Sequence, residues 1–160
     1  MTRWASMSNL IILAGVPGCG KSTLAELFRY HYKIVSSDVI RKRLAGSLKE
    51  AHREDIKPWD VFYGEIATAL QHDVDVVADA TFLTVEHRQR IRDVASDCHA
   101  DTHFILFKNL DEARARNAAR PDETRVPPEV MEGFVDLYSD TLVRLPQECY
   151  SSVTSVGSYR

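Results

Sequence analysis

One stretch of nine residues, GVPGCGKST at positions 15–23, constrains the fold of this chain more than any other. It follows directly on the apolar run LIILA at 10–14 and precedes a segment whose apolar residues recur at helical spacing. Its first eight residues match G-x-x-x-x-G-K-[ST], in which glycines allow several backbone N–H groups to converge on a phosphate chain. The sequence therefore predicts a strand, a phosphate-binding loop and a helix in direct succession.

Two side chains of this loop have a predicted chemical task. The Lys21 ammonium would neutralise the β- and γ-phosphates of a nucleoside triphosphate, and the Ser22 hydroxyl would ligate Mg²⁺. The N-terminus of the following helix adds a partial positive charge behind the loop. We therefore expect ATP or GTP to be bound, with Mg²⁺, by Gly15, Gly18, Cys19, Gly20, Lys21, Ser22 and Thr23.

Apolar runs alternate with helical patterns along the rest of the chain. Runs at 10–14, 74–81 and 102–107 have the continuous apolar character of strands buried on both faces, and a shorter one lies at 34–35. Apolar residues at helical spacing predict helices within 24–32, 39–46, 58–70, 84–95, 111–120 and 130–145. This alternation predicts an α/β fold of the P-loop NTPase type, with a parallel sheet of four or five strands flanked by helices and a small helical lid.

Length and composition limit the organisation of the molecule. A chain of 160 residues fits one domain, 1–160, with the lid at about 111–128. We expect the ends, 1–8 and 151–160, to be flexible, with at most one edge strand after Ser151. A net charge of -3 gives no overall cationic field for nucleic acid, so any such contact must be local.

The cysteine count and hydropathy bear on the compartment. Three cysteines without a CxxC pair favour neither a disulfide framework nor a zinc knuckle. No apolar run reaches the roughly 18 residues of a membrane helix, and no signal-peptide core precedes the first strand. We therefore expect a cytoplasmic protein without a membrane partner.

Two acidic residues follow predicted strands. In open α/β sheets, ligands bind beyond the carboxyl ends of the strands, so Asp38 and Asp79 should share that edge with Lys21. Asp79 follows an apolar run and suits support of Mg²⁺, directly or through water. Asp38 is free to accept a hydroxyl proton, and Arg41, three residues on, shares its helical face. Alternatively, Asp38 only stabilises the start of a helix that Ser36 or Ser37 caps.

A basic segment, RARNAARPDETRVPPEV at 114–130, predicts the lid. Arg116 and Arg120 share a helical face, Pro121 ends that helix, and Pro127 and Pro128 begin the next. An arginine placed on the transferred phosphoryl group can accelerate the reaction by 10³- to 10⁵-fold. The alternative is a solvated basic face balanced by nearby acids.

Four blocks together resemble the bacteriophage type of 5′-hydroxyl polynucleotide kinase, a family of nucleic-acid repair. They are GVPGCGKST, SSDVIRKRL, VVADATFLTVEHRQR and RNAARPDETRVPPEVMEGF, and they span most of the chain from Leu10 to about Pro146. The resemblance implies transfer of the γ-phosphate to the 5′-OH end of RNA or DNA, in the host cytoplasm if a phage encodes the chain. No phosphatase or ligase motif accompanies these blocks.

The same resemblance assigns roles to single residues. Asp38 matches the general base, and Arg41 matches an arginine on the phosphate that is 3′ to the acceptor nucleotide. Asp79 matches the acid that orients this arginine. Arg120 matches the lid arginine on the donor phosphates, and Arg116 is a second, weaker lid match.

Two other functions remain open. Kinases of a small-molecule or nucleotide-sugar hydroxyl, such as antibiotic phosphotransferases and zeta-toxin-like kinases, share the loop and a similar aspartate. A nucleotide-dependent switch shares the loop alone, and it needs neither Asp38 with Arg41 nor the lid arginines.

Overall fold

The described residues form five strands and six α-helices. The computed structural model describes residues 7–51 and 57–157, and side chains are described outside 47–51. In chain order, the elements are β1 (Asn9–Ala14), α1 (Lys21–Glu26), β2 (Lys33–Ser36), α2 (Ser37–Ala51), α3 (Pro58–Gln71), β3 (Val76–Asp79), α4 (Val85–Asp97), β4 (Asp101–Phe107), α5 (Leu110–Ala118), α6 (Pro128–Arg144), a 3₁₀ turn (Leu145–Gln147) and β5 (Ser152–Val156).

The strands form one parallel sheet in the order β2-β3-β1-β4-β5. Strand β1 lies at its centre, with Leu10 opposite Val76 of β3 and Thr102 of β4. Residues Leu10 to Ala14 are buried because both faces of the sheet are covered by helices. The predicted α/β fold with a parallel sheet is thus confirmed.

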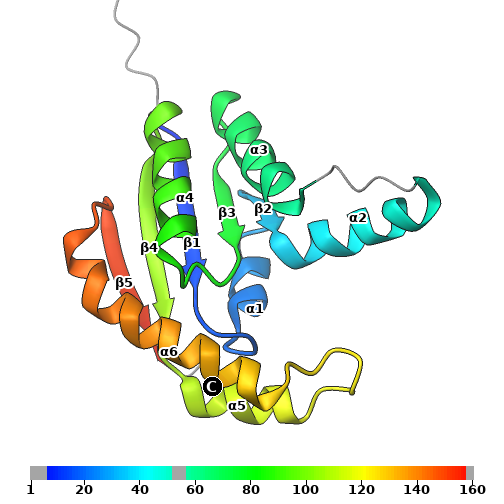
Figure 1. Ribbon diagram of the computed structural model, residues 1–160. Coiled ribbons are helices and arrows are strands. Elements are labelled where there is room, and N and C mark those ends of the chain that lie inside the picture. The colour runs from blue at the N-terminus through cyan, green and yellow to red at the C-terminus, as the bar shows by residue number, and fades with distance from the viewer. Residues whose placement is uncertain (1–6, 52–56, 158–160) are drawn as a thin grey trace, which may run out of the picture.

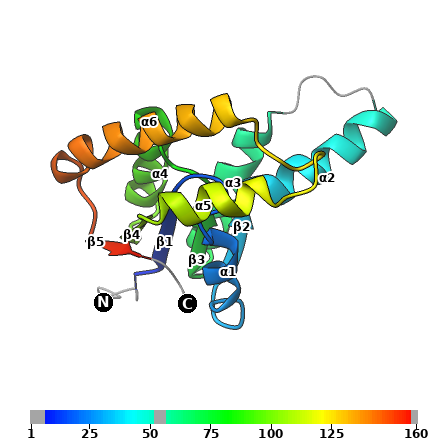
Figure 2. The same ribbon diagram turned by 90° about the horizontal axis from the view of Figure 1, so that it is seen from below.

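The helices lie on both faces of the sheet and at its lower edge. Helices α3 and α4 cover one face, and α1 lies against the other (Figures 1 and 2). All five strands run in the same direction, so their carboxyl ends meet at the edge where the loop 15–20, α5 and the start of α6 lie (Figure 1). This edge is where the sequence places the candidate site.

Three elements are shorter than predicted. Helix α5 ends at Ala118, so Arg120 lies beyond the helix that was expected to carry it. Strand β3 covers residues 76–79 of the expected 74–81, because the backbone leaves the sheet after Asp79. Helix α1 ends at Glu26, although apolar spacing predicts a helix as far as Tyr32. The N–H groups of Leu27 and Phe28 bond three residues back, so the chain continues as tight turns. Phe28 and Tyr32 still pack against each other, with ring centroids 5.2 Å apart.

Helix starts follow their local sequence. The Thr84 side chain accepts the N–H of His87 at 3.3 Å, which caps α4. At α2, the Ser36 hydroxyl accepts the N–H of Val39 at 3.4 Å. Pro58 and Pro128 occupy the first positions of α3 and α6, where proline loses no helical hydrogen bond.

A fully buried arginine of α4 ties the far end of α6 to the loop that follows β3. Arg88 donates to Glu148 at 2.9 Å, to the Thr141 hydroxyl at 2.8 Å and to the carbonyl of Phe82 at 3.3 Å. Phe82 has a left-handed φ of 48°, which is unusual for a bulky residue. Burial of its ring and the bond from Arg88 hold this conformation in the loop that follows Asp79.

Part of the C-terminal segment pairs with the sheet. Residues 152–156 form the single edge strand that the sequence leaves room for, whereas 1–6 and 158–160 lie outside the described residues. The expected flexibility of the ends stays a prediction. Within residues 7–51 and 57–157, no helix has the length and apolar character needed to span a membrane.

Candidate functional site

The glycines of the loop 15–20 are required by its geometry. Gly18 and Gly20 adopt φ values of 85° and 100°, in the left-handed region that side chains rarely occupy. A Cβ at Gly18 would lie 2.9 Å from the carbonyl oxygen of Ala113, and one at Gly15 would lie 2.7 Å from the Cys19 sulfur. The loop can therefore curl this tightly only with glycine at these positions.

The Lys21 side chain forms hydrogen bonds to the backbone of this loop. Its ammonium donates to the carbonyl oxygens of Gly15 at 2.9 Å and Val16 at 3.1 Å, and it lies 3.5 Å from the Cys19 sulfur. The positive charge is thus held on the loop itself. The first N–H groups of α1, which begins at Lys21, have no acceptor within the helix and point the same way.

Ser22 and Asp79 meet between α1 and β3. The Ser22 hydroxyl donates to Oδ2 of Asp79 at 2.9 Å, and Asp79 is buried. Burial raises the pKa of Asp79, while the bond from Ser22 and the charge of Lys21 oppose this shift and the charge of Asp38 adds to it. Two residues 57 positions apart therefore form one polar pair beside the loop.

Asp38 and Arg41 lie in the first turns of α2, beyond the end of β2. The Asp38 side chain is 78% exposed, and its Oδ1 lies 3.7 Å from Nη1 of Arg41. Its charge acts on Asp79, so the two carboxylates share the carboxyl edge as predicted. Arg41 also lies over the ring of Trp59, 5.4 Å from the ring centroid. An entering hydroxyl can reach Asp38 from solvent.

The structure separates Asp79 from Arg41, which the family resemblance pairs. Within residues 7–51 and 57–157, the hydrogen-bond partner of the Asp79 carboxylate is Ser22, and the ionic partner of Arg41 is Asp38. The orienting role implied for Asp79 is therefore not visible as a direct contact.

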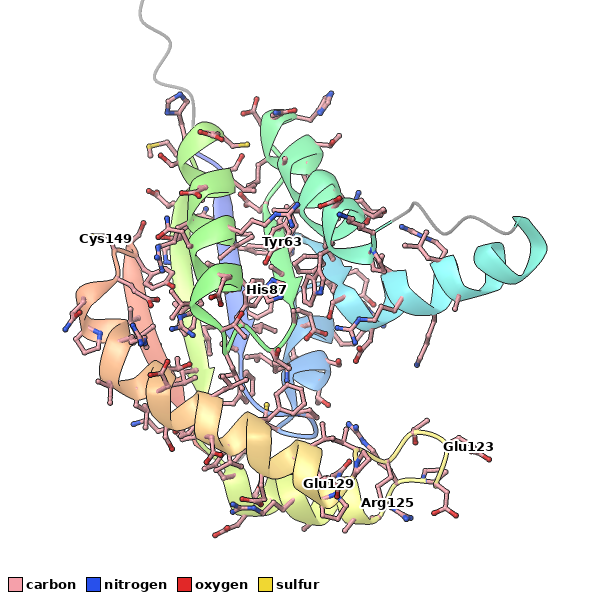
Figure 3. The ribbon with its side chains drawn as sticks, viewed as in Figure 1. Tyr63, His87, Glu123, Arg125, Glu129 and Cys149 are labelled. Carbon is pink, nitrogen blue, oxygen red and sulfur yellow. The ribbon has the colours of Figure 1, made fainter. Side chains whose placement is uncertain are left out.

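The basic segment forms α5, the loop 119–127 and the start of α6. Asn117 closes the base of this loop, since its side chain donates to the Val126 carbonyl at 2.7 Å and accepts the Val126 N–H at 2.9 Å. Arg125 bonds to Asp122 at 2.7 Å and to the carbonyl of Arg120 at 2.7 Å. Figure 3 shows Arg125 on the outer side of this loop, away from the sheet.

Of the two lid arginines, Arg116 is the one in contact with the loop 15–20. Its Nη1 donates to the Gly18 carbonyl at 3.3 Å, and its Nη2 lies 3.6 Å from Glu112. Across the part of the chain that the structure describes, the Arg120 side chain contacts neither the loop nor an acid. The order of importance predicted for these two arginines is thus not reflected in this conformation.

Thr23 lies beside a small hollow next to the loop. This hollow has a volume of about 60 Å³ and is lined by Gly20, Thr23, Leu24, Leu27 and Arg116. The guanidinium of Arg116 therefore forms a boundary shared by the phosphate loop and this hollow.

Asn109 supports the loop and is absent from the sequence analysis. Its Nδ2 donates to the carbonyl of Cys19 at 3.0 Å, across 90 residues of sequence. Its Oδ1 is buried and has no hydrogen-bond partner among the described residues. Its place two residues after the end of β4, the neighbour of β1, was the signal that could have identified it, by the reasoning used for Asp38 and Asp79.

Comparisons with known proteins agree with this fold. A family profile described as "AAA domain" matches residues 10–145. No curated protein matches the sequence at a significant level.

Solved structures share the fold at low identity. A candidate kinase from Chloroflexus aurantiacus J-10-fl is 19% identical, with a TM-score of 0.70 over 96% of this chain and 86% of that one. A gluconokinase from Sinorhizobium meliloti 1021 is 17% identical, with a TM-score of 0.63 over 96% and 85%.

A third structure, the Pnkp1/Rnl/Hen1 RNA repair complex, is 21% identical, with a TM-score of 0.64. The match covers 90% of this chain and 49% of that one, so the chain spans about half of this relative.

Proposed function

The chain belongs to the AAA domain family, and from that premise we propose that it is a P-loop kinase that phosphorylates the 5′-hydroxyl end of RNA or DNA. The observation that carries this proposal is the pairing of Asp38 with Arg41 at the carboxyl edge that also bears Lys21 and the Ser22–Asp79 pair. A hydroxyl base beside a cation is what an anionic alcohol acceptor needs. The resemblance to the bacteriophage type of polynucleotide kinase supports the same acceptor.

The donor side of the reaction rests on the loop 15–20 and Lys21. The ammonium lies 2.9 Å from the Gly15 carbonyl, so a triphosphate in the loop would meet it at close range. Arg116 already contacts the loop, and Arg120 has no ionic partner among the described residues that would hold it away. We propose that both bind the donor phosphates, with Arg120 moving in when ATP or GTP binds.

The residues beside the loop fit Mg²⁺. This ion keeps several waters and takes few protein oxygens, and a hydroxyl 2.9 Å from a buried carboxylate provides such a set. Ser22 would hold the ion directly and Asp79 through water. When bound, it neutralises charge on the phosphate oxygens.

Asp38 is the proposed general base. As the acceptor hydroxyl attacks the γ-phosphorus, Asp38 takes its proton and the bond from phosphorus to the bridging oxygen of the nucleoside diphosphate breaks. Such base assistance contributes about 10²- to 10⁴-fold. Arg41, 3.7 Å away, would pair with the phosphate next to the reacting sugar.

A small-molecule hydroxyl is the alternative acceptor. The fold shared with the gluconokinase supports this alternative. The two acceptors differ in charge, since a sugar lacks the phosphate that Arg41 would bind. A switch without phosphoryl transfer would leave the exposed Asp38 without a task.

The test is transfer of label from γ-labelled ATP or GTP, with Mg²⁺, to 5′-hydroxyl oligonucleotides, nucleosides, sugars and aminoalcohols. We expect label on the oligonucleotides. Asp38→Asn should reduce turnover by at least about 10²-fold with little change in nucleotide affinity. Asp136→Asn, the same change on an exposed acid of α6, is the control. Label only on sugars or aminoalcohols would favour the alternative, and full turnover of Asp38→Asn would refute the base.

A further inference from the structure

Three aromatic rings gather between α3 and α4, next to Arg41. The ring centroids of Trp59 and His87 lie 3.9 Å apart, and those of Trp59 and Tyr63 lie 6.0 Å apart at an interplanar angle of 30°. Figure 3 shows Tyr63 and His87 side by side between the two helices.

The three rings differ in their exposure to solvent. Tyr63 is buried, whereas Trp59 and His87 are partly buried and keep part of their surface in solvent. The Tyr63 hydroxyl lies 2.9 Å from Nδ1 of His87 and 3.1 Å from the carbonyl oxygen of His87, and these contacts hold the histidine in place. Trp59 also packs edge-on against the buried Phe62, with centroids 5.4 Å apart. The two partly exposed rings, held by these contacts, are named here the Trp59–His87 platform.

This platform continues directly from the proposed acceptor site. Arg41 lies 5.4 Å from the Trp59 centroid and 3.7 Å from Asp38, so one side chain touches both the ring and the proposed base. On the far side, Arg90 lies 4.4 Å from the Tyr63 centroid and pairs with Asp60 at 2.6 Å. Both arginines are about half exposed, so their contacts can be exchanged for a ligand's phosphates at little cost.

The electrostatics of the platform favour a neutral, flat ligand. Burial lowers the pKa of His87, and Arg90 and Arg41 lower it further, while Glu86 opposes them. These effects favour the neutral form of the histidine. Neutral rings stack on nucleobases without regard to base identity, because every base has a π-face.

We propose that the Trp59–His87 platform binds the base of the acceptor's terminal nucleotide by stacking, while Arg41 pairs with the adjoining phosphate. The proposal rests on the proposed function, because it names the part of the acceptor that this edge recognises. A nucleotide offers a flat ring and an anion together, which matches a tryptophan ring beside Arg41, whereas a neutral sugar lacks the anion and the ammonium of an aminoalcohol would be repelled by Arg41. Trp59 is then a specificity residue that holds the acceptor and takes no part in proton transfer.

The first test is binding of a fluorescent single-stranded 5′-hydroxyl oligonucleotide, measured by anisotropy without a phosphate donor. Trp59→Ala should weaken binding by about 5- to 150-fold, the usual range for loss of one stacked base. Trp59→Phe should stay close to wild type because a ring remains. Tyr30→Ala, which removes a ring that is 78% exposed near α1, is the control and should change nothing.

A second oligonucleotide identifies the contact. Its terminal nucleotide lacks the base, and it should bind wild type as weakly as the intact strand binds Trp59→Ala. Combining the two changes should cost little more than either alone, because both remove the same contact. Additive losses would overturn the proposal, as would equal binding of the intact strand by wild type and Trp59→Ala.

Tryptophan fluorescence gives an independent signal. The chain has two tryptophans, so in Trp4→Phe all tryptophan emission comes from Trp59. Binding of the intact strand should quench this emission, and binding of the strand without the terminal base should quench it much less. Unchanged emission on saturation with the intact strand would place the base elsewhere and overturn the proposal.

These readouts separate the inference from the proposed function. Strand binding that depends on Trp59, without transfer of label, would refute the kinase assignment and leave the platform in place. Transfer of label to oligonucleotides with an unchanged KM in Trp59→Ala would refute the platform alone. An absence of strand binding by wild type would overturn the platform directly.

Discussion

Removal of the Glu148 side chain should destabilise the protein more than loss of a surface ion pair can. Its carboxylate accepts bonds from Arg88 at 2.9, 3.2 and 3.1 Å, from Arg92 at 2.8 Å and from the Tyr150 hydroxyl at 2.8 Å. Arg88 is fully buried. In Glu148→Ala, its Nε and Nη2 groups lose their acceptors, while Nη1 keeps Thr141 and the carbonyl of Phe82.

The magnitude follows from leaving a buried charge without its partner. Breaking a buried ion pair on one side costs about 3–5 kcal/mol, a large part of the 5–15 kcal/mol that stabilises a typical domain. For a chain of this size, 1 kcal/mol lowers Tm by about 2–4 °C. We therefore expect Tm to fall by roughly 6–20 °C. Glu148→Gln keeps an accepting oxygen and should lose less.

Urea denaturation followed by circular dichroism measures this difference. The control is Asp140→Ala, which removes an exposed pair with Arg144 at 2.8 Å on α6 and should cost about 0.3–0.5 kcal/mol. Equal losses of unfolding free energy in Glu148→Ala and Asp140→Ala would refute the reasoning, because burial would then have no effect on how much an ion pair contributes to stability.

The pH dependence of the same variants has a defined sign. Burial acts to raise the pKa of Glu148, but the bonds from Arg88 and Tyr150 and the charges of Arg88 and Arg92 hold it below its ordinary value of 4.5. A depressed pKa in the folded state contributes stability that is complete above the unfolded value and is lost as the pH falls through the folded one. The stability gap between wild type and Glu148→Gln should therefore narrow below pH 4.5.

Two further variants test the site itself. Asp79 has a raised pKa, so its ionisation costs stability as the pH rises above the ordinary pKa of 3.8. Asp79→Asn should therefore gain in Tm relative to wild type between acid and neutral pH, while it weakens Mg²⁺-dependent nucleotide binding. A Tm difference that is independent of pH in thermal melts would contradict this. Asn109→Ala should weaken ATP binding by several-fold in calorimetry, because the Cys19 carbonyl loses its 3.0 Å bond and the loop loses support, whereas wild-type affinity would show that the loop holds its shape alone.

Much of the fold follows from local sequence. The apolar runs, the capping Thr84 and the prolines at helix starts act within a few residues of themselves, so the alternation of strands and helices was predictable. The early end of α1 at Glu26 was not predictable, because tight turns allow Phe28 to pack on Tyr32 as well as a helix does. Local patterns cannot distinguish those two outcomes.

The candidate site divides along the same line. The roles of Lys21 and Ser22 follow from the loop motif and that of Asp38 from its place after a strand, and they stay predictions that the geometry supports. The contact of Arg116 with the loop, where Arg120 was favoured, depends on how α5 packs against the loop 15–20. Sequence spacing predicts both arginines on one helical face, but α5 ends at Ala118, so Arg120 lies beyond the helix.

The sequence by itself determined that a phosphate-binding loop follows a central strand, because glycine conformations and the spacing to lysine are local properties. Tertiary structure alone decided the strand order, the support of the loop by Asn109, the Arg88–Glu148 pair and the Trp59–His87 platform. Each of these joins residues that lie 28 to 90 positions apart, or whole elements, in contacts that exist only once the sheet is assembled. Their energies depend on burial and mutual orientation, which the chain acquires only on folding.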